Sequence, residues 1–167
     1  MGVALTRLDT PLGEMVLVAA NGAVRVLEFA DQPERVRRAL GRHPDAVPHP
    51  APSPHAAALG AYFAGQLEAL DTIPVEPAGT AFQRLAWSAL RRVPAGSPCS
   101  YAELARRIGR PEAVRAVGTA NGANPVSIIV PCHRLLGTGG ALTGYGGGLE
   151  RKAWLLEHER RWAAVTG

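Results

Sequence analysis

Helix-start signals crowd the second half of the chain and constrain its fold more than any other feature. Thr80 and Ser100 each stand three residues before a Gln or a Glu, which is the spacing of a capping box. Pro111 stands where proline is common, in the first turn of a helix. The apolar spacing and these signals predict helices over 81–93, 101–109, 111–122 and 149–162. Two short helices joined by a tight glycine-containing turn, 101–109 and 111–122, are typical of a helix-turn-helix.

The first half has the pattern of a β-meander instead. Residues 3–8, 14–20 and 23–29 read as strands, and Asn21-Gly22 is a hairpin turn between the last two. A short helix over 33–42, a proline-rich loop over 43–55 and a helix over 56–70 follow. The chain is therefore expected to be an α+β protein of two domains, a sheet domain over 1–76 and a mostly helical domain over 77–167.

The two halves also differ in charge. Residues 1–76 carry six Arg against nine acidic residues, whereas residues 77–167 carry eleven Arg and one Lys against five acidic residues. The net charges are −3 and +7, as expected if only the second half meets a polyanion. Small residues around Arg115, among them Ala116, Gly118 and Thr119, allow a helix either to approach a DNA groove or to pack tightly on its neighbours. The positive charge favours DNA.

Composition excludes several classes of protein. The chain contains no run of eighteen apolar residues, and its N-terminus does not have the pattern of a secretory signal. Two cysteines, Cys99 and Cys132, are too few for a disulfide framework, so a reducing, cytoplasmic location is expected. The Gly-rich stretch 137–148 lacks the lysine and the spacing of a phosphate-binding loop.

The stretch "IIVPCHRLLG", residues 128–137, holds the candidate reactive group. Cys132 follows a largely apolar run, residues 126–130, that predicts a buried strand or extended segment, and Pro131 ends that run. His133 and Arg134 place basic groups beside the thiol and favour its thiolate form. Because neighbouring residues of a straight strand point to opposite faces, a Cys132–His133 interaction needs a turn or a bridging water. Three interpretations remain open on these residues alone: a reactive thiol, a metal ligand and an inert buried cysteine.

Longer stretches of the chain resemble a known family. The sequence "NPVSIIVPCHRLLG", the later "LTGYGGGLERKAWLLEHE" and the upstream "GTAFQRLAWSALRRVPAGSPCSYAELARRIGRPEAVRAVG" closely resemble the O6-alkylguanine-DNA alkyltransferases, over roughly 79–159. The resemblance implies a ribonuclease H-like, antiparallel-sheet N-terminal domain and a helical DNA-binding domain with a helix-turn-helix. It also implies DNA repair by irreversible transfer of an alkyl group from O6 of guanine to the protein, with O4-alkylthymine as a second candidate substrate. The expected partner is double-stranded DNA carrying O6-alkylguanine, bound by a monomer without cofactor, metal or membrane.

The resemblance also assigns roles to individual residues. Cys132 would accept the alkyl group, His133 would act as base through a water, and Glu159 would orient His133. Asn124 would hold the turn at the site, and Tyr101 would donate a proton to the leaving guanine. The residues implied at the DNA are Ser100, Tyr101, Arg115, Ala116, Gly118, Thr119 and Arg134. The residues implied around the base are Val130, Tyr145, Gly146 and Gly147, where Gly146 would leave room for larger alkyl groups.

Two other functions stay open on this sequence. A protein that binds alkylated bases without repairing them would not need Cys132. A cysteine hydrolase would turn over repeatedly on a small ester or peptide, and it usually draws its histidine from a distant part of the chain.

Overall fold

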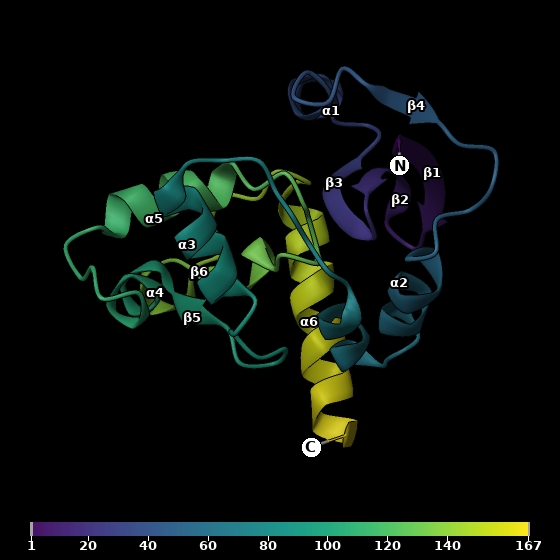
Figure 1. Ribbon diagram of the computed structural model, residues 1–167. Helices are drawn as coiled ribbons and strands as arrows, with labels where there is room; N and C mark the ends of the chain where they lie inside the picture. The colour runs from purple at the N-terminus through teal and green to yellow at the C-terminus, as the bar shows by residue number, and fades with distance from the viewer. Residues whose placement is uncertain (1, 167) are drawn as a thin grey trace. The chain divides into compact units, whose positions relative to one another are not determined.

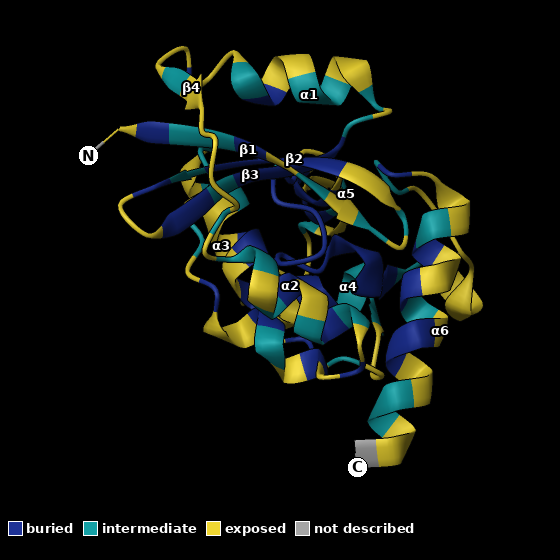
Figure 2. Ribbon diagram, turned by 90° about the vertical axis from the view of Figure 1, so that its right-hand side faces the viewer, coloured by how far each residue is buried: buried dark blue, intermediate teal, exposed yellow. Residues whose placement is uncertain are grey.

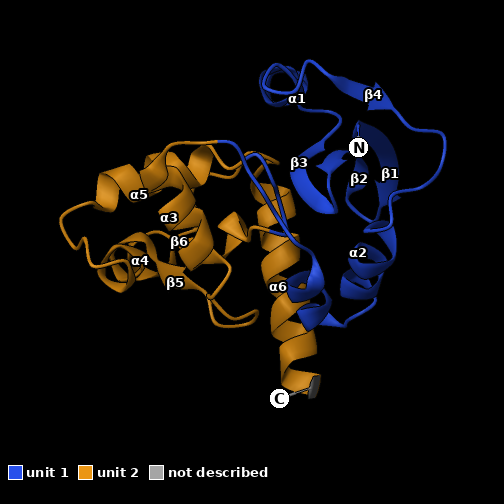
Figure 3. Cartoon of the chain, viewed as in Figure 1, with its two compact units in different colours: residues 1–78, 125–129 blue, residues 79–124, 130–167 orange. Residues whose placement is uncertain are grey.

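The computed structural model describes residues 2–166, and it divides them into two compact units. Residues up to Ala78 and the short segment Pro125–Ile129 form unit 1, and Gly79–Asn124 and Val130 onward form unit 2 (Figure 3). The first division falls two residues beyond the boundary expected at 76/77. The return of residues 125–129 to unit 1 was not expected from the sequence.

Unit 1 is built on a four-stranded mixed sheet with the strand order β3-β2-β1-β4. Strands β1 (Val3–Thr10), β2 (Gly13–Ala20) and β3 (Ala23–Phe29) are antiparallel, and β4 (Ala46–Pro48) pairs parallel to β1. Asn21 and Gly22 turn the β2–β3 hairpin with φ angles of 53° and 80°, the left-handed conformation that an Asn-Gly turn supplies. The sheet prediction is confirmed, apart from β4, which lies inside the segment 43–55 expected to be a loop.

Three helical segments accompany the sheet of unit 1: α1 (Pro33–Leu40), α2 (Ala56–Phe63) and the 3₁₀ helix η1 (Leu67–Thr72). The single helix expected over 56–70 is wrong, because Gly65 adopts a φ of 114° and interrupts it. The core of unit 1 consists chiefly of the apolar side chains of β2 and β3, which Figure 2 shows largely buried.

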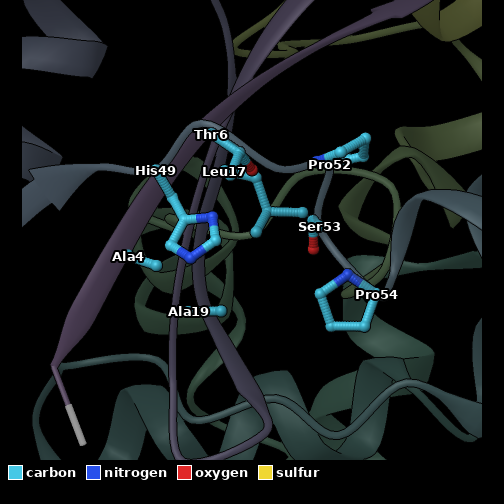
Figure 4. Close-up of a pocket in the computed structure, with 8 residues that line it drawn as sticks. All are labelled: Ala4, Thr6, Leu17, Ala19, His49, Pro52, Ser53 and Pro54. Carbon is cyan, nitrogen blue, oxygen red and sulfur yellow. The ribbon is translucent and has the colours of Figure 1, made fainter.

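A small cavity of about 110 Å³ lies on the sheet of unit 1, between β1, β2 and the proline-rich stretch 49–54 (Figure 4). Its lining residues are Ala4, Thr6, Leu17, Ala19, His49, Pro52, Ser53 and Pro54. Ala4 and Thr6 pair with Ala19 and Leu17 across the β1–β2 ladder, so the floor of the cavity is rigid sheet.

Unit 2 is mostly helical, as expected (Figure 1). Its helices are α3 (Ala81–Leu90), α4 (Tyr101–Arg107), α5 (Val114–Gly122) and α6 (Leu149–Thr166), with the 3₁₀ turns η2 (Cys132–Arg134) and η3 (Thr138–Gly140). Two short parallel strands, β5 (Cys99–Ser100) and β6 (Leu135–Leu136), complete it. None of the helices described is long and apolar enough to span a membrane.

The capping signals position these helices. Thr80 Oγ1 accepts a hydrogen bond from the amide of Gln83, and the Gln83 side chain accepts one from the amide of Thr80, so the predicted capping box of α3 is confirmed. Ser100 caps α4 by accepting from the amide of Glu103. The following helix begins at Val114 rather than at Pro111, which lies in the turn before it.

The glycine that follows α3 offers a test of the packing in unit 2. Gly96 has a φ of 83°, and a Cβ atom there would lie 2.6 Å from Cβ of Ala163 on α6. Gly109 has a similar φ of 74° with open space around it. We expect Gly96→Ala to lower the free energy of unfolding by about 2–4 kcal/mol and Gly109→Ala by about 1 kcal/mol, because only the first adds a clash to the backbone strain. Urea denaturation of both variants measures the difference, and equal losses would contradict the described contact between α6 and the loop after α3.

Candidate active site around Cys132

Cys132 opens a single 3₁₀ turn in which two asparagines hold the backbone. The side chain is 4% exposed, so the thiol lies just beneath the surface of unit 2. The Cys132 amide donates to the carbonyl of Val130 (2.8 Å), and Asn124 Nδ2 donates to the same oxygen (2.9 Å). Asn121 Nδ2 donates to the carbonyl of Cys132 (3.2 Å). Asn124 therefore lies where a residue shaping this turn must lie, and Asn121 is a second such residue that sequence reasoning missed.

The strand or extended segment expected over 126–130 is a turn instead. These residues are buried, as their apolar character predicts, but the bridge between Val126 and Leu27 in unit 1 is isolated and belongs to no strand. Ile128 has a φ of 69°, a left-handed conformation that no strand contains and that is rare for a β-branched residue. Apolar runs alone do not distinguish a buried strand from a buried turn, and nothing in the sequence signals this one.

His133 and Arg134, the two residues that follow Cys132, form a buried charged cluster with Glu159. His133 Nε2 lies 2.8 Å from Glu159 Oε2, with both side chains at 1% exposure or less. The Arg134 guanidinium donates to both oxygens of the same carboxylate, at 2.8 Å and 2.9 Å, and to the carbonyl of Val93 at 2.7 Å. Glu159 thus lies where it can orient His133, as the family resemblance implies. Arg134 is also buried and committed to this cluster, so the DNA contact expected for it does not fit its position.

Burial and charge fix the protonation states of the cluster. Burial lowers the pKa of His133 below its ordinary value, although Glu159 acts in the opposite direction, so the imidazole is neutral at neutral pH. Burial alone would raise the pKa of Glu159, but the hydrogen bonds from His133 and Arg134 and the positive charge of Arg134 lower it far below its ordinary value. With Nε2–H donating to an ionised Glu159, His133 carries its lone pair on Nδ1. Nδ1 has no hydrogen-bond partner among the described protein atoms.

Lys152 is a further buried cation that the sequence interpretation missed. It lies on α6, its side chain is fully buried, and its ammonium donates to the carbonyls of Thr143 and Gly144 in the Gly-rich loop. Burial lowers its pKa, and the negative charge of the Cys132 thiolate opposes that shift. One signal in the sequence could have drawn attention to it: Lys152 is the only lysine of an Arg-rich chain, and it lies in the last predicted helix. Lys152 holds the loop 137–148 to α6 and places a positive charge within electrostatic reach of the thiol.

A groove of about 500 Å³ separates the helix-turn-helix from the start of the Gly-rich loop. Its lining residues are Ser100, Tyr101, Ala102, Val114, Arg115, Gly118, Thr119, Leu136, Gly137 and Thr138. Tyr101 reaches the loop, with its hydroxyl 3.4 Å from Thr143 Oγ1. Five of the residues expected at DNA therefore line one groove, and Ala116 lies exposed on α5 beside them.

Tyr145, one of the residues expected around the base, lies near His133, and two others are at least half-buried. The ring of Tyr145 stands edge-on to His133, with ring centroids 6.4 Å apart, so the loop brings it to the cluster. Gly147 is buried and Gly146 half-buried before α6 begins. The Val130 carbonyl already accepts from Asn124 and Cys132, and any further hydrogen bond from a ligand would share that oxygen.

The cluster predicts a strong dependence of stability on Glu159. We expect Glu159→Gln to lower the free energy of unfolding by about 3–5 kcal/mol at pH 7, because it leaves the buried Arg134 without its counter-charge. Since the pKa of Glu159 is lowered on folding, this stabilisation is fully present above the ordinary pKa of the carboxyl and is lost only in stronger acid. Glu157→Gln, on the exposed face of the same helix, is the matched control and should change little. Equal effects of the two substitutions in urea denaturation would contradict the buried cluster.

Comparison with known proteins shows to which family the chain is similar. Residues 81–161 match the family model described as 6-O-methylguanine DNA methyltransferase, DNA binding domain, and residues 3–77 match its ribonuclease-like domain. The methylated-DNA–protein-cysteine methyltransferase of Salmonella typhimurium is 44% identical over 159 residues, which cover 92% of this chain and 93% of the relative. The protein of that name from Mycolicibacterium paratuberculosis is 45% identical over 160 residues, or 95% and 93% of the two chains.

A solved structure supports the same placement. The Mycobacterium tuberculosis OGT in complex with DNA has a TM-score of 0.81 and 40% identity, over 95% of this chain and 94% of that one. Both halves of the chain, and nearly its whole length, are thus matched in sequence and in fold. The chain belongs to the 6-O-methylguanine DNA methyltransferase family.

Proposed function

We propose that this protein repairs DNA by direct reversal, taking an alkyl group from O6 of guanine onto Sγ of Cys132. O4-alkylthymine is a second candidate substrate. A bond forms between Sγ and the alkyl carbon, the bond from that carbon to O6 breaks, and the guanine leaves with a proton. The observation that carries the proposal is the position of Cys132 beside a buried His133–Glu159 pair in the unit that also contains the helix-turn-helix. Because a thioether has no easy leaving group, each molecule acts once.

Activation of the thiol follows from the buried cluster. His133 Nδ1 has no hydrogen-bond partner among the described protein atoms, whereas Nε2 is taken by Glu159. Nδ1 is therefore the nitrogen that receives the Cys132 proton, through a water, and the ionised Glu159 stabilises the imidazolium that forms. Lys152 favours the thiolate by its charge. Displacement at a saturated carbon suits this soft nucleophile.

The groove of unit 2 supports access to the base. An alkylated guanine inside a duplex cannot reach a thiol beneath the protein surface, so it must leave the stack. Arg115 is exposed on α5 in the wall of the groove, where it can enter the duplex and fill the gap. The residues around it are small, which allows close approach of the duplex: Ser100, Ala116, Gly118 and Thr119. Tyr101, at the start of α4, is the proposed proton donor to the departing guanine.

The proposed base pocket is formed by Tyr145, Gly146, Gly147 and the Val130 carbonyl. Because Gly146 has no side chain, we propose that the pocket admits alkyl groups larger than methyl. Asn124 keeps the Val130 carbonyl and the Cys132 turn in place. Cys99 and Cys132 form no disulfide bond in the described part of the chain, which fits a reducing compartment, and we propose the cytoplasm.

Transfer of a labelled group tests the function directly. Duplex DNA carrying O6-[methyl-³H]guanine should label the protein up to one methyl group per molecule, and peptide mass spectrometry should place that methyl on Cys132. Cys132→Ser should take up no label, whereas Cys99→Ser should behave as the unchanged protein. A tight complex without label would instead support a damage-binding protein, and label on Cys132→Ser would overturn the assignment.

The role of Arg115 can be separated from the chemistry. We expect Arg115→Ala to slow transfer from duplex DNA at least about tenfold, because unstacking a base costs a few kcal/mol that the inserted side chain offsets. Reaction with free O6-benzylguanine should be unchanged, since that substrate needs no flipping. Arg161→Ala, an exposed cation of α6, is the control for loss of one positive charge. An equal loss on both substrates would show that Arg115 acts on the site rather than on the duplex.

A further inference from the structure

Shortly before Cys132, the proposed nucleophile, five residues of the chain leave unit 2 and join unit 1. We call this segment, Pro125–Ile129, the excursion. Asn124 and Val130 belong to unit 2 and are tied by the hydrogen bond from Asn124 Nδ2 to the Val130 carbonyl (2.9 Å). The residues between them, Pro125–Ile129, belong to unit 1 (Figure 3). Cys132 follows two residues after Val130, so the excursion lies shortly before the active-site turn along the chain.

Strand β3 holds the excursion through its backbone. The amide of Leu27 donates to the carbonyl of Pro125 (2.9 Å), and the amide of Ser127 donates to the carbonyl of Leu27 (2.8 Å). These two bonds form a short parallel bridge between Leu27 and Val126. Val126 and Ser127 are buried, at 0% and 2% exposure, so the bonds are shielded from water.

A buried carboxylate adds a third tie. Ser127 Oγ donates to Glu28 Oε1 (3.1 Å), and Glu28 is 3% exposed although it lies on a sheet strand. Arg35 on α1 pairs with the same carboxylate at 3.2 Å. Burial raises the pKa of Glu28, and Arg35 and Ser127 oppose that shift. An apolar residue would be less costly at this position if packing were its only role.

The residue after Ser127 shows why the excursion needs such ties. Ile128 is fully buried with a φ of 69°, a strained conformation that persists only where the surroundings determine it. Its two neighbours are joined by the bond from the Ile129 amide to the Ser127 carbonyl (2.8 Å). Ser127 is thus bonded at its amide, hydroxyl and carbonyl, and it anchors the strained residue.

We infer that Glu28 and Ser127 are positioning residues for the alkyl transfer, and that they set the approach of Cys132 by fixing the backbone of residues 125–129. This inference rests on the proposed function. It gives the sheet of unit 1 a part in the reaction, although neither residue touches the thiol or the substrate. No bond is made or broken at Glu28 or Ser127. They determine where the thiol lies when DNA presents the alkylated base.

Ser127→Ala is the most direct test, because it removes one hydrogen bond and keeps both backbone bonds of the excursion. We expect the single-turnover rate of methyl transfer at saturating DNA to fall about tenfold, since small displacements of a reacting group are costly. The affinity for undamaged duplex DNA should stay within about twofold, because the groove is unchanged. Glu28→Ala should reproduce both results, and Glu28→Gln should restore most of the rate, because its amide oxygen can still accept from Ser127.

Glu14→Ala is the matched control, since Glu14 is an exposed carboxylate of the same sheet and pairs with Arg7. An unchanged transfer rate in Ser127→Ala would overturn the inference, as would an equal fall in Glu14→Ala. So would a loss of DNA affinity that accounts for the whole effect. If Glu28→Ala fails to fold, the transfer rate of Ser127→Ala compared with that of the unchanged protein still tests the inference.

Labelling of Cys132 by iodoacetamide without DNA separates this inference from the proposed function. Slower labelling in Ser127→Ala than in the unchanged protein supports positioning even if the protein transfers no methyl group. If Ser127→Ala and the unchanged protein are labelled equally fast and transfer the methyl group equally fast, the inference is overturned.

Discussion

The active-site turn depends on one buried carboxylate. Glu159 receives His133 on one oxygen and Arg134 on both, so two consecutive residues after the cysteine are bound to the same point on α6. Such a charge is tolerated away from water only because every partner is in place. The same contacts select the tautomer of His133 and leave Nδ1 as the nitrogen that we propose accepts the thiol proton. One carboxylate therefore both stabilises unit 2 and prepares the proposed nucleophile.

Hydrogen bonds hold the chain before, at and after Cys132. Asn121 and Asn124, at the end of α5, bind the backbone around it, and Lys152 of α6 binds the loop that follows it. The segment that precedes it is bonded to β3 of unit 1. This arrangement suits a reagent that acts once, because a rigid, prepared site favours a single fast transfer.

The sequence predicted the large features because they rest on local rules. Capping signals and helical spacing located the helices of unit 2, and the Asn21-Gly22 turn located a hairpin. The family resemblance predicted that Glu159 pairs with His133, although the two are 26 residues apart in the sequence. Features set by tertiary contacts were missed: the buried turn at Ile128, the break at Gly65 and the burial of Lys152. Arg134 was expected at the DNA, and its burial was missed because its partner, Glu159, is distant in the sequence.

The dependence of methyl transfer on pH tests the account most directly. Burial lowers the pKa of His133, so the imidazole should stay neutral and able to accept the thiol proton at pH values below its ordinary pKa. The single-turnover rate should therefore show no loss with a midpoint near pH 6.5 when the pH falls from 8 toward 5.5. A rate that falls with a midpoint at about 6.5, as for an exposed histidine, would contradict the buried His133–Glu159 pair as the activating group.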